Sequence, residues 1–156
     1  MMKKLNTMID KFSHYKVIPV IAVETVEEAL GLGKVLVEAG LPIAEVTFRS
    51  EKAAQAMKAM KEAYPELLVG AGTILNAGQA VLARDHGADF IVSPGFNINT
   101  VKACHDMLLP IVPGINNPMG IEMALEAGLK MLKFFPAEAS GGTAMIKALL
   151  APYRDI

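Results

Sequence analysis

Short apolar segments alternate with amphipathic segments along the whole chain. Each apolar segment has the length of a buried β-strand, and successive starts lie 20 to 26 residues apart. That spacing accommodates one strand and one helix per unit, so the pattern predicts six strand–helix units, which form a parallel sheet with right-handed connections. The predicted strands start at Val17, Ile43, Leu67, Asp89, Leu109 and Lys130.

Helix-capping residues follow most of these strands. Side chains of Ser, Thr and Asn accept hydrogen bonds from the free amides at a helix start, and a Glu or Gln three residues later completes a capping box. A separate amphipathic helix is predicted in residues 1–16, and the helix after Thr25 should end near Gly40. The predicted caps are Thr25 with Glu28, Ser50, Asn76 with Gln79, and Asn117 before Pro118.

Alternating strands and helices fit either an open doubly wound sheet or a closed (β/α) barrel. The segment "VIPVIAVETVEEAL" has no glycine after its strand, and "GAGTIL" lacks the third glycine of a dinucleotide fingerprint, which disfavours the open fold. In "IAEVTFR", alternation predicts one apolar face and one polar face: Ala44, Val46 and Phe48 against Glu45, Thr47 and Arg49.

A polar strand face distinguishes the two folds. Interior strands of an open parallel sheet are covered by helices on both sides and are apolar on both. A barrel strand has an inward face that can turn polar toward its carboxyl end, where barrel active sites lie. The polar face of 43–49 therefore predicts a closed (β/α) barrel, with six strand–helix units visible in a single domain, residues 1–156.

Composition narrows the partners to small molecules. With 53% hydrophobic residues and a net charge of −1, the composition does not favour nucleic acid or an anionic membrane as a binding partner.

The single cysteine, Cys104, excludes an internal disulfide, and we expect it to be a core residue. No signal peptide or membrane span is apparent, so we expect a cytoplasmic protein. The histidines His14, His86 and His105 fall in predicted helices without metal-ligand spacing, so no metal site is predicted.

One lysine stands inside an apolar strand. In "MLKFFP", Lys133 shares a face with Met131 and Phe135. Burial disfavours an ammonium group, and a neutral amine can attack a carbonyl carbon to form a Schiff base. The other interpretation is a lysine whose stem packs on the phenylalanines while its ammonium group reaches water or a carboxylate.

Glu45 and Arg49 lie four residues apart on one strand face. They could form an ion pair with each other. Alternatively, Arg49 binds a carboxylate ligand while Glu45 transfers protons. With Lys133 on another strand of the same barrel, they predict a base, an anion-binding group and a nucleophile around one cavity. Thr73, after the glycines of "GAGT", could add a hydroxyl donor near that carboxylate.

The segments "AEVTFR", "GAGT", "SPG", "PG" and "KFFPAEASGG", in this order, resemble the class I 2-keto-3-deoxy-6-phosphogluconate (KDPG) and 4-hydroxy-2-oxoglutarate (KHG) aldolases over nearly the whole chain. The resemblance implies a cofactor-free carbon–carbon lyase that cleaves KDPG to pyruvate and glyceraldehyde 3-phosphate in the Entner-Doudoroff pathway. Cleavage of KHG to pyruvate and glyoxylate is a further expectation. Lys133 matches the Schiff-base lysine and Glu45 the general acid/base.

The resemblance also assigns the substrate-binding residues. Arg49 and Thr73 match groups that hold the pyruvate end of the substrate, and Pro94 and Phe135 match residues that line the pocket. It implies a (β/α)8 barrel of the TIM type, of which about six units are present in this chain, and a homotrimer with a small 2-keto acid as substrate.

Family members continue through two further strand–helix units beyond the sixth. We therefore expect the chain to lack strands 7 and 8, and with them the loops that commonly bind phosphate in such barrels. Besides an active aldolase, two alternatives stay open: a catalytically impaired fragment, and a noncatalytic barrel that binds keto acids or phosphate.

Overall fold

Six parallel strands form one sheet in the order of the chain. The computed structural model describes residues 2–50, 52–154 and 156. The strands are β1 (Val20–Ile21), β2 (Ile43–Thr47), β3 (Leu68–Gly72), β4 (Phe90–Ser93), β5 (Ile111–Ile115) and β6 (Lys133–Phe134). The helices are α1 (Met2–Tyr15), α2 (Val26–Glu38), α3 (Ala53–Ala63), α4 (Ala77–Asp85), α5 (Ile98–Asp106), α6 (Pro118–Glu126) and α7 (Gly142–Leu150), with a 3-10 helix η1 (Glu138–Ser140) before α7.

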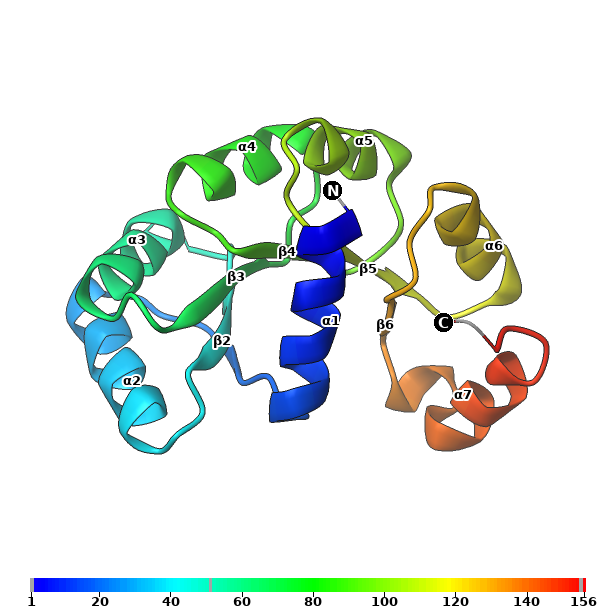
Figure 1. Ribbon diagram of the computed structural model, residues 1–156, viewed down its shortest axis with the longest axis horizontal. Coiled ribbons are helices and arrows are strands. Elements are labelled where there is room, and N and C mark those ends of the chain that lie inside the picture. Colours follow the sequence, from blue (N-terminus) through cyan, green and yellow to red (C-terminus); the bar gives the residue numbers. More distant parts are fainter. Residues whose placement is uncertain (1, 51, 155) are drawn as a thin grey trace.

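The sheet curves into part of a barrel. Helices α2 to α7 follow one another in an arc around its outer side, whereas α1 lies on the inner side (Figure 1). Each described strand pairs in parallel with its neighbours in sequence, and no pairing within the described residues joins β1 to β6. The predicted architecture, a (β/α)-barrel type with six units, is confirmed.

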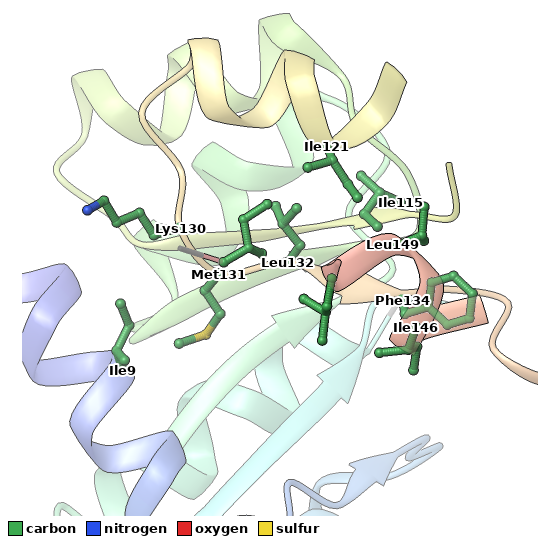
Figure 2. A pocket seen from close by; sticks show the side chains of 11 residues that line it. Ile9, Ile115, Ile121, Lys130, Met131, Leu132, Phe134, Ile146 and Leu149 are labelled. Carbon is green, nitrogen blue, oxygen red and sulfur yellow. The ribbon is translucent and has the colours of Figure 1, made fainter. Parts of the chain in front are cut away.

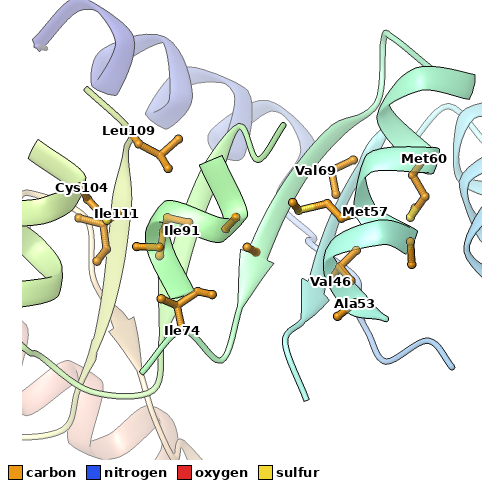
Figure 3. Close-up of a cluster of buried hydrophobic side chains, with 14 of the residues drawn as sticks. Val46, Ala53, Met57, Met60, Val69, Ile74, Ile91, Cys104, Leu109 and Ile111 are labelled. Carbon is orange, nitrogen blue, oxygen red and sulfur yellow. The ribbon is translucent and has the colours of Figure 1, made fainter. Parts of the chain in front are cut away.

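The larger core lies between the sheet and the outer helices (Figure 3). Outward-facing residues of the strands, such as Val46, Val69 and Ile91, are fully buried there. Met57 and Met60 of α3 pack against them with no exposed surface. Because each strand places alternate residues on this side, the opposite set points to the inside of the barrel.

Helix α1 closes the inner side near the amino ends of the strands. Its Met8 and Phe12 pack in a second apolar cluster with Ile43, Leu68 and Phe90. The Phe12 and Phe90 rings meet edge to face with centroids 4.9 Å apart. The predicted amphipathic helix in residues 1–16 is therefore confirmed, and its apolar side covers the barrel floor.

Three of the four predicted caps are confirmed. The side chains of Thr25, Asn76 and Asn117 accept hydrogen bonds from amides of the first helical turn. The prediction for Ser50 is wrong, because α3 starts later and its N-cap is Lys52. The Ser50 hydroxyl instead donates to the carbonyl of Val23, 3.1 Å away, and so ties the segment after β2 to the segment after β1.

Strands β1 and β6 are shorter than predicted. The apolar pattern started at Val17 and Lys130, but only two residues of each segment have strand geometry. Both strands lie at the ends of the sheet order, so each has a partner on one side only within the described residues.

Cys104 is buried in the outer core, as predicted. Burial in this apolar layer raises the pKa of its thiol to about 12. None of the described helices combines the length and apolar character needed to cross a bilayer.

The outer core supplies a direct test of packing. Met57→Ala should lower the free energy of unfolding by about 2–5 kcal/mol, because it leaves a cavity between α3 and the sheet. Lys58→Ala, one residue along on the exposed side, should change it by less than about 0.5 kcal/mol. Chemical denaturation measures both; similar losses in the two variants would contradict this description of the core.

Candidate active site

Lys133 of β6 and Glu45 of β2 meet inside the barrel. Lys133 Nζ lies 3.5 Å from Glu45 Oε1, and Glu45 is only 5% exposed. Four strand spacings separate β2 from β6 in the sheet order, about 19 Å on a flat sheet. The two side chains can meet only because the sheet curls, so the curvature of the barrel creates this pair.

The absence of a side chain at Gly72 of β3 leaves room for the Glu45 carboxylate. Gly72 is the register partner of Thr47, two residues beyond Glu45 along β2. A Cβ at Gly72 would overlap the carboxylate and the Cγ of Glu45. The Glu45 side chain therefore leans across to β3 and occupies the space that a side chain at position 72 would take.

Burial controls the protonation of Glu45. Desolvation raises the pKa of its carboxyl group above the ordinary value. The cationic Lys133, and more weakly Arg49, oppose this shift by favouring the charged form. A buried carboxyl group with a raised pKa beside a lysine is the arrangement expected of a residue that exchanges protons during a reaction.

Lys133 is partly open to solvent and contacts an aromatic ring. Its side chain is 29% exposed, and Nζ lies 5.2 Å from the centroid of the Phe135 ring. In this structure the Lys133 ammonium group contacts the Glu45 carboxylate, as in the second of the two interpretations of Lys133 drawn from the sequence. The same position also leaves Nζ accessible from the inside of the barrel.

The other predicted site residues lie just beyond the carboxyl ends of the strands. Arg49 is exposed in the turn after β2, and no ion pair joins it to Glu45 among the described residues. Thr73 follows β3 with φ of 58°, a left-handed conformation that is costly for a β-branched residue. Pro94 and Phe135 both line a cavity of ≈ 400 Å³.

A second glycine brings the Pro94 loop close to β6. Gly114 of β5 is the register partner of Lys133, and a Cβ there would overlap the carbonyl of Pro94. The segment after β4 can therefore approach the strand pair that carries the lysine. The neighbours of these glycines follow from the strand register, which the sequence does not give.

Two further cavities differ in their chemistry. One of ≈ 260 Å³ lies under the Lys133–Glu45 pair and is otherwise lined by apolar side chains such as Phe12, Val92 and Val112. Another, of ≈ 330 Å³, lies between β6, α6 and α7 (Figure 2). Among the described residues its lining is apolar except for Lys130. No cluster of metal-ligating side chains occurs among the described residues.

The fold is of the (β/α)-barrel class, with a lysine–carboxylate pair on its inner side. The family model for "KDPG and KHG aldolase" matches residues 8–156. A 2-dehydro-3-deoxy-phosphogluconate aldolase of Haemophilus influenzae is 52% identical over 149 residues, which are 96% of this chain and 70% of the relative. This chain belongs to the KDPG and KHG aldolase family, whose members are carbon–carbon lyases.

Solved structures agree with this assignment. The 2-keto-3-deoxy-6-phosphogluconate aldolase of Zymomonas mobilis, solved with 3-phosphoglycerate, is 37% identical with a TM-score of 0.86, over 89% of this chain and 66% of that one. A KDPG aldolase of Legionella pneumophila, 34% identical with a TM-score of 0.86 over 89% and 68%, holds pyruvate as a covalent carbinolamine. The chain thus spans about two thirds of the length of these structures.

The raised pKa of Glu45 predicts a pH-dependent stability. The folded protein keeps the proton of Glu45 at pH values where the unfolded chain has released it, so the free energy of unfolding falls as pH rises from about the ordinary value of 4.5 through the folded pKa. Glu45→Gln should remove this slope, about 1.4 kcal/mol for each unit of pKa difference.

Denaturation midpoints measured at several pH values provide the test. Glu38→Gln is the matched control, because Glu38 is exposed on α2 and pairs only with Lys34 among the described residues. It should keep the slope of the unmodified protein. Equal slopes in the Glu45→Gln variant and the unmodified protein would refute the burial argument.

Proposed function

We propose that this chain carries the catalytic centre of a class I aldolase that cleaves KDPG to pyruvate and glyceraldehyde 3-phosphate. Cleavage of KHG to pyruvate and glyoxylate is a second reaction open to the same site. The observation that carries the proposal is the 3.5 Å contact of Lys133 Nζ with a buried carboxylate at the carboxyl ends of the strands. The names of relatives up to 52% identical support the KDPG substrate.

The reaction begins at Lys133. After Lys133 passes a proton to the Glu45 carboxylate, the nearest base, its neutral amine attacks the C2 ketone of the substrate. The hydroxyl group of the resulting carbinolamine takes the proton back from Glu45 and leaves as water, which gives a cationic iminium and a Glu45 carboxylate. The carbinolamine of pyruvate in the Legionella pneumophila enzyme supports this first step.

Carbon–carbon cleavage uses the iminium as an electron sink. Glu45, deprotonated again and acting through a water molecule, takes the proton of the C4 hydroxyl group. The electron pair of the C3–C4 bond moves toward the iminium nitrogen, which forms an enamine, and glyceraldehyde 3-phosphate leaves as the aldehyde. The raised pKa of Glu45 makes its carboxylate a stronger base for this step.

Product release reverses the first step. The Glu45 carboxylic acid returns its proton to C3 of the enamine, water adds to the iminium carbon, and pyruvate leaves the Lys133 amine free. The proton balance closes, and no cofactor takes part in any step. One carboxyl group thus serves as both base and acid.

The remaining residues bind the substrate. Arg49 and Thr73, at the ends of β2 and β3, hold the carboxylate of the pyruvate half. Arg49 offers a planar set of donors suited to a carboxylate. Pro94 and Phe135 line the cavity of ≈ 400 Å³ beyond the ends of β4, β5 and β6, separate from the cavity that Lys133 and Glu45 line. A homotrimer, implied by the family resemblance, and a cytoplasmic location stay predictions.

Trapping with borohydride tests the nucleophile. The folded protein incubated with pyruvate and borohydride should carry a reduced adduct on Lys133, found by digestion and mass spectrometry. Lys133→Met should abolish the adduct. Lys130→Met, on an exposed lysine three residues earlier, should leave it unchanged. A folded protein without the adduct would refute the Schiff-base mechanism.

Glu45→Gln tests the acid/base role. The amide cannot accept the C4 hydroxyl proton, so KDPG cleavage should slow by a factor of about 10²–10⁴. Pyruvate trapping on Lys133 should still occur at long incubation, because water can replace the slower proton transfers. Single-turnover kinetics with KDPG measure the cleavage step, and unchanged rates would remove Glu45 from this role.

A further inference from the structure

A buried hydroxyl group near Glu45 has no hydrogen-bond partner. Thr47 lies on the inner face of β2, two residues after Glu45, and is only 4% exposed. Its Oγ1 is buried and unpaired among the described residues. An unpaired buried hydroxyl destabilises a protein, whereas valine has nearly the same shape, suits a strand equally well and carries no polar atom. Packing alone therefore does not explain a threonine here.

The strand register places this hydroxyl beside the Glu45 carboxyl group. Thr47 is the register partner of Gly72. The Glu45 side chain occupies the space directly over Gly72, where a Cβ would overlap its carboxylate. The Thr47 side chain and the Glu45 carboxyl group thus adjoin the same glycine, on the same face and at the same level of the sheet.

The proposed reaction reduces the number of hydrogen-bond donors that Lys133 offers to Glu45. The charged groups that face Glu45 are Lys133 from β6 and Arg49 from the turn after β2. A lysine ammonium has three N–H donors, whereas an iminium nitrogen keeps one. Arg49 is exposed and makes no ion pair with Glu45 in the described part of the chain. The buried carboxyl group therefore needs another partner once the Schiff base has formed.

We propose that Thr47 is a positioning residue for Glu45: its hydroxyl group binds the Glu45 carboxyl group while Lys133 is joined to the keto acid. This inference rests on the aldolase function proposed above. A hydroxyl group donates to a carboxylate and accepts from a carboxylic acid. Thr47 can therefore hold Glu45 in place both before and after Glu45 has taken the substrate proton.

Three variants separate this role from packing. Thr47→Val removes the hydroxyl group and keeps the shape, and Thr47→Ser restores the hydroxyl group. Thr100→Val is the matched control, because Thr100 of α5 has the only other unpaired buried side-chain polar atom among the described residues and lies in the outer helical layer. The readouts are kcat and KM for KDPG, the pH profile of kcat, pyruvate trapping and the denaturation midpoint.

Thr47→Val should lower kcat by about 10- to 100-fold, the effect of losing a hydrogen bond to a charged group, with little change in KM or in the trapped adduct. The acidic limb of the kcat profile should move to higher pH, because losing a donor disfavours the carboxylate. The denaturation midpoint should stay the same or rise, since an unpaired buried hydroxyl group is removed. Thr47→Ser should recover kcat and the profile, and Thr100→Val should leave both unchanged.

Two results would overturn the role of Thr47: an unchanged kcat and pH profile in Thr47→Val, or equal losses in Thr47→Val and Thr47→Ser, which would point to the methyl group. If the unmodified protein neither traps pyruvate nor cleaves KDPG, the proposed function fails by itself. If pyruvate is trapped, titration of the Glu45 carboxyl carbon by NMR in the pyruvate adduct tests the Thr47 contact independently of cleavage. A pKa of Glu45 that is higher in Thr47→Val supports the contact, and equal values refute it.

Discussion

The contact of Lys133 with Glu45 depends on the curvature of the sheet, and the rest of the site follows from that curvature. The two residues belong to strands four places apart, yet their charged atoms lie 3.5 Å from each other. Outward-facing side chains pack under the outer helices, and α1 packs inside the arc against the amino ends of the strands. These two apolar layers hold the curved sheet from both sides and leave its carboxyl ends for polar groups.

Two glycines inside the strands leave the space that the groups of the candidate active site occupy. Gly72 leaves room for the Glu45 carboxylate over β3, and Gly114 lets the Pro94 segment approach the strand pair that carries Lys133. Both lie inside strands, where glycine weakens the strand and usually marks a close approach of another group. Any larger residue at position 72 would push Glu45 away from its present contact with the lysine. Glycine at positions 72 and 114 therefore weakens β3 and β5 locally but permits the close contacts that form the site.

Burial and charge act on Glu45 in opposite directions. Desolvation raises the pKa of the carboxyl group, and the neighbouring Lys133 limits that rise. A carboxyl group balanced in this way can accept and return a proton within one catalytic cycle. The hydroxyl group of Thr47, buried at the same level of the sheet, has no hydrogen-bond partner among the described residues, and burial without a partner is costly for a polar group.

The sequence alone determined the strand–helix alternation and the inward placement of Glu45 and Thr47 on β2, which follow from local periodicity. That Lys133 is the reactive amine stays a prediction, drawn from the cost of placing a charge in an apolar segment. The sequence did not determine the start of α3, where Ser50 bonds to Val23 instead of capping the helix, nor the short extents of β1 and β6. Only the tertiary structure decided that Lys133, not Arg49, pairs with Glu45, and that Gly72 makes room for the carboxylate. Those contacts join residues far apart in the chain, and strand register and sheet curvature, which no local pattern encodes, bring them together.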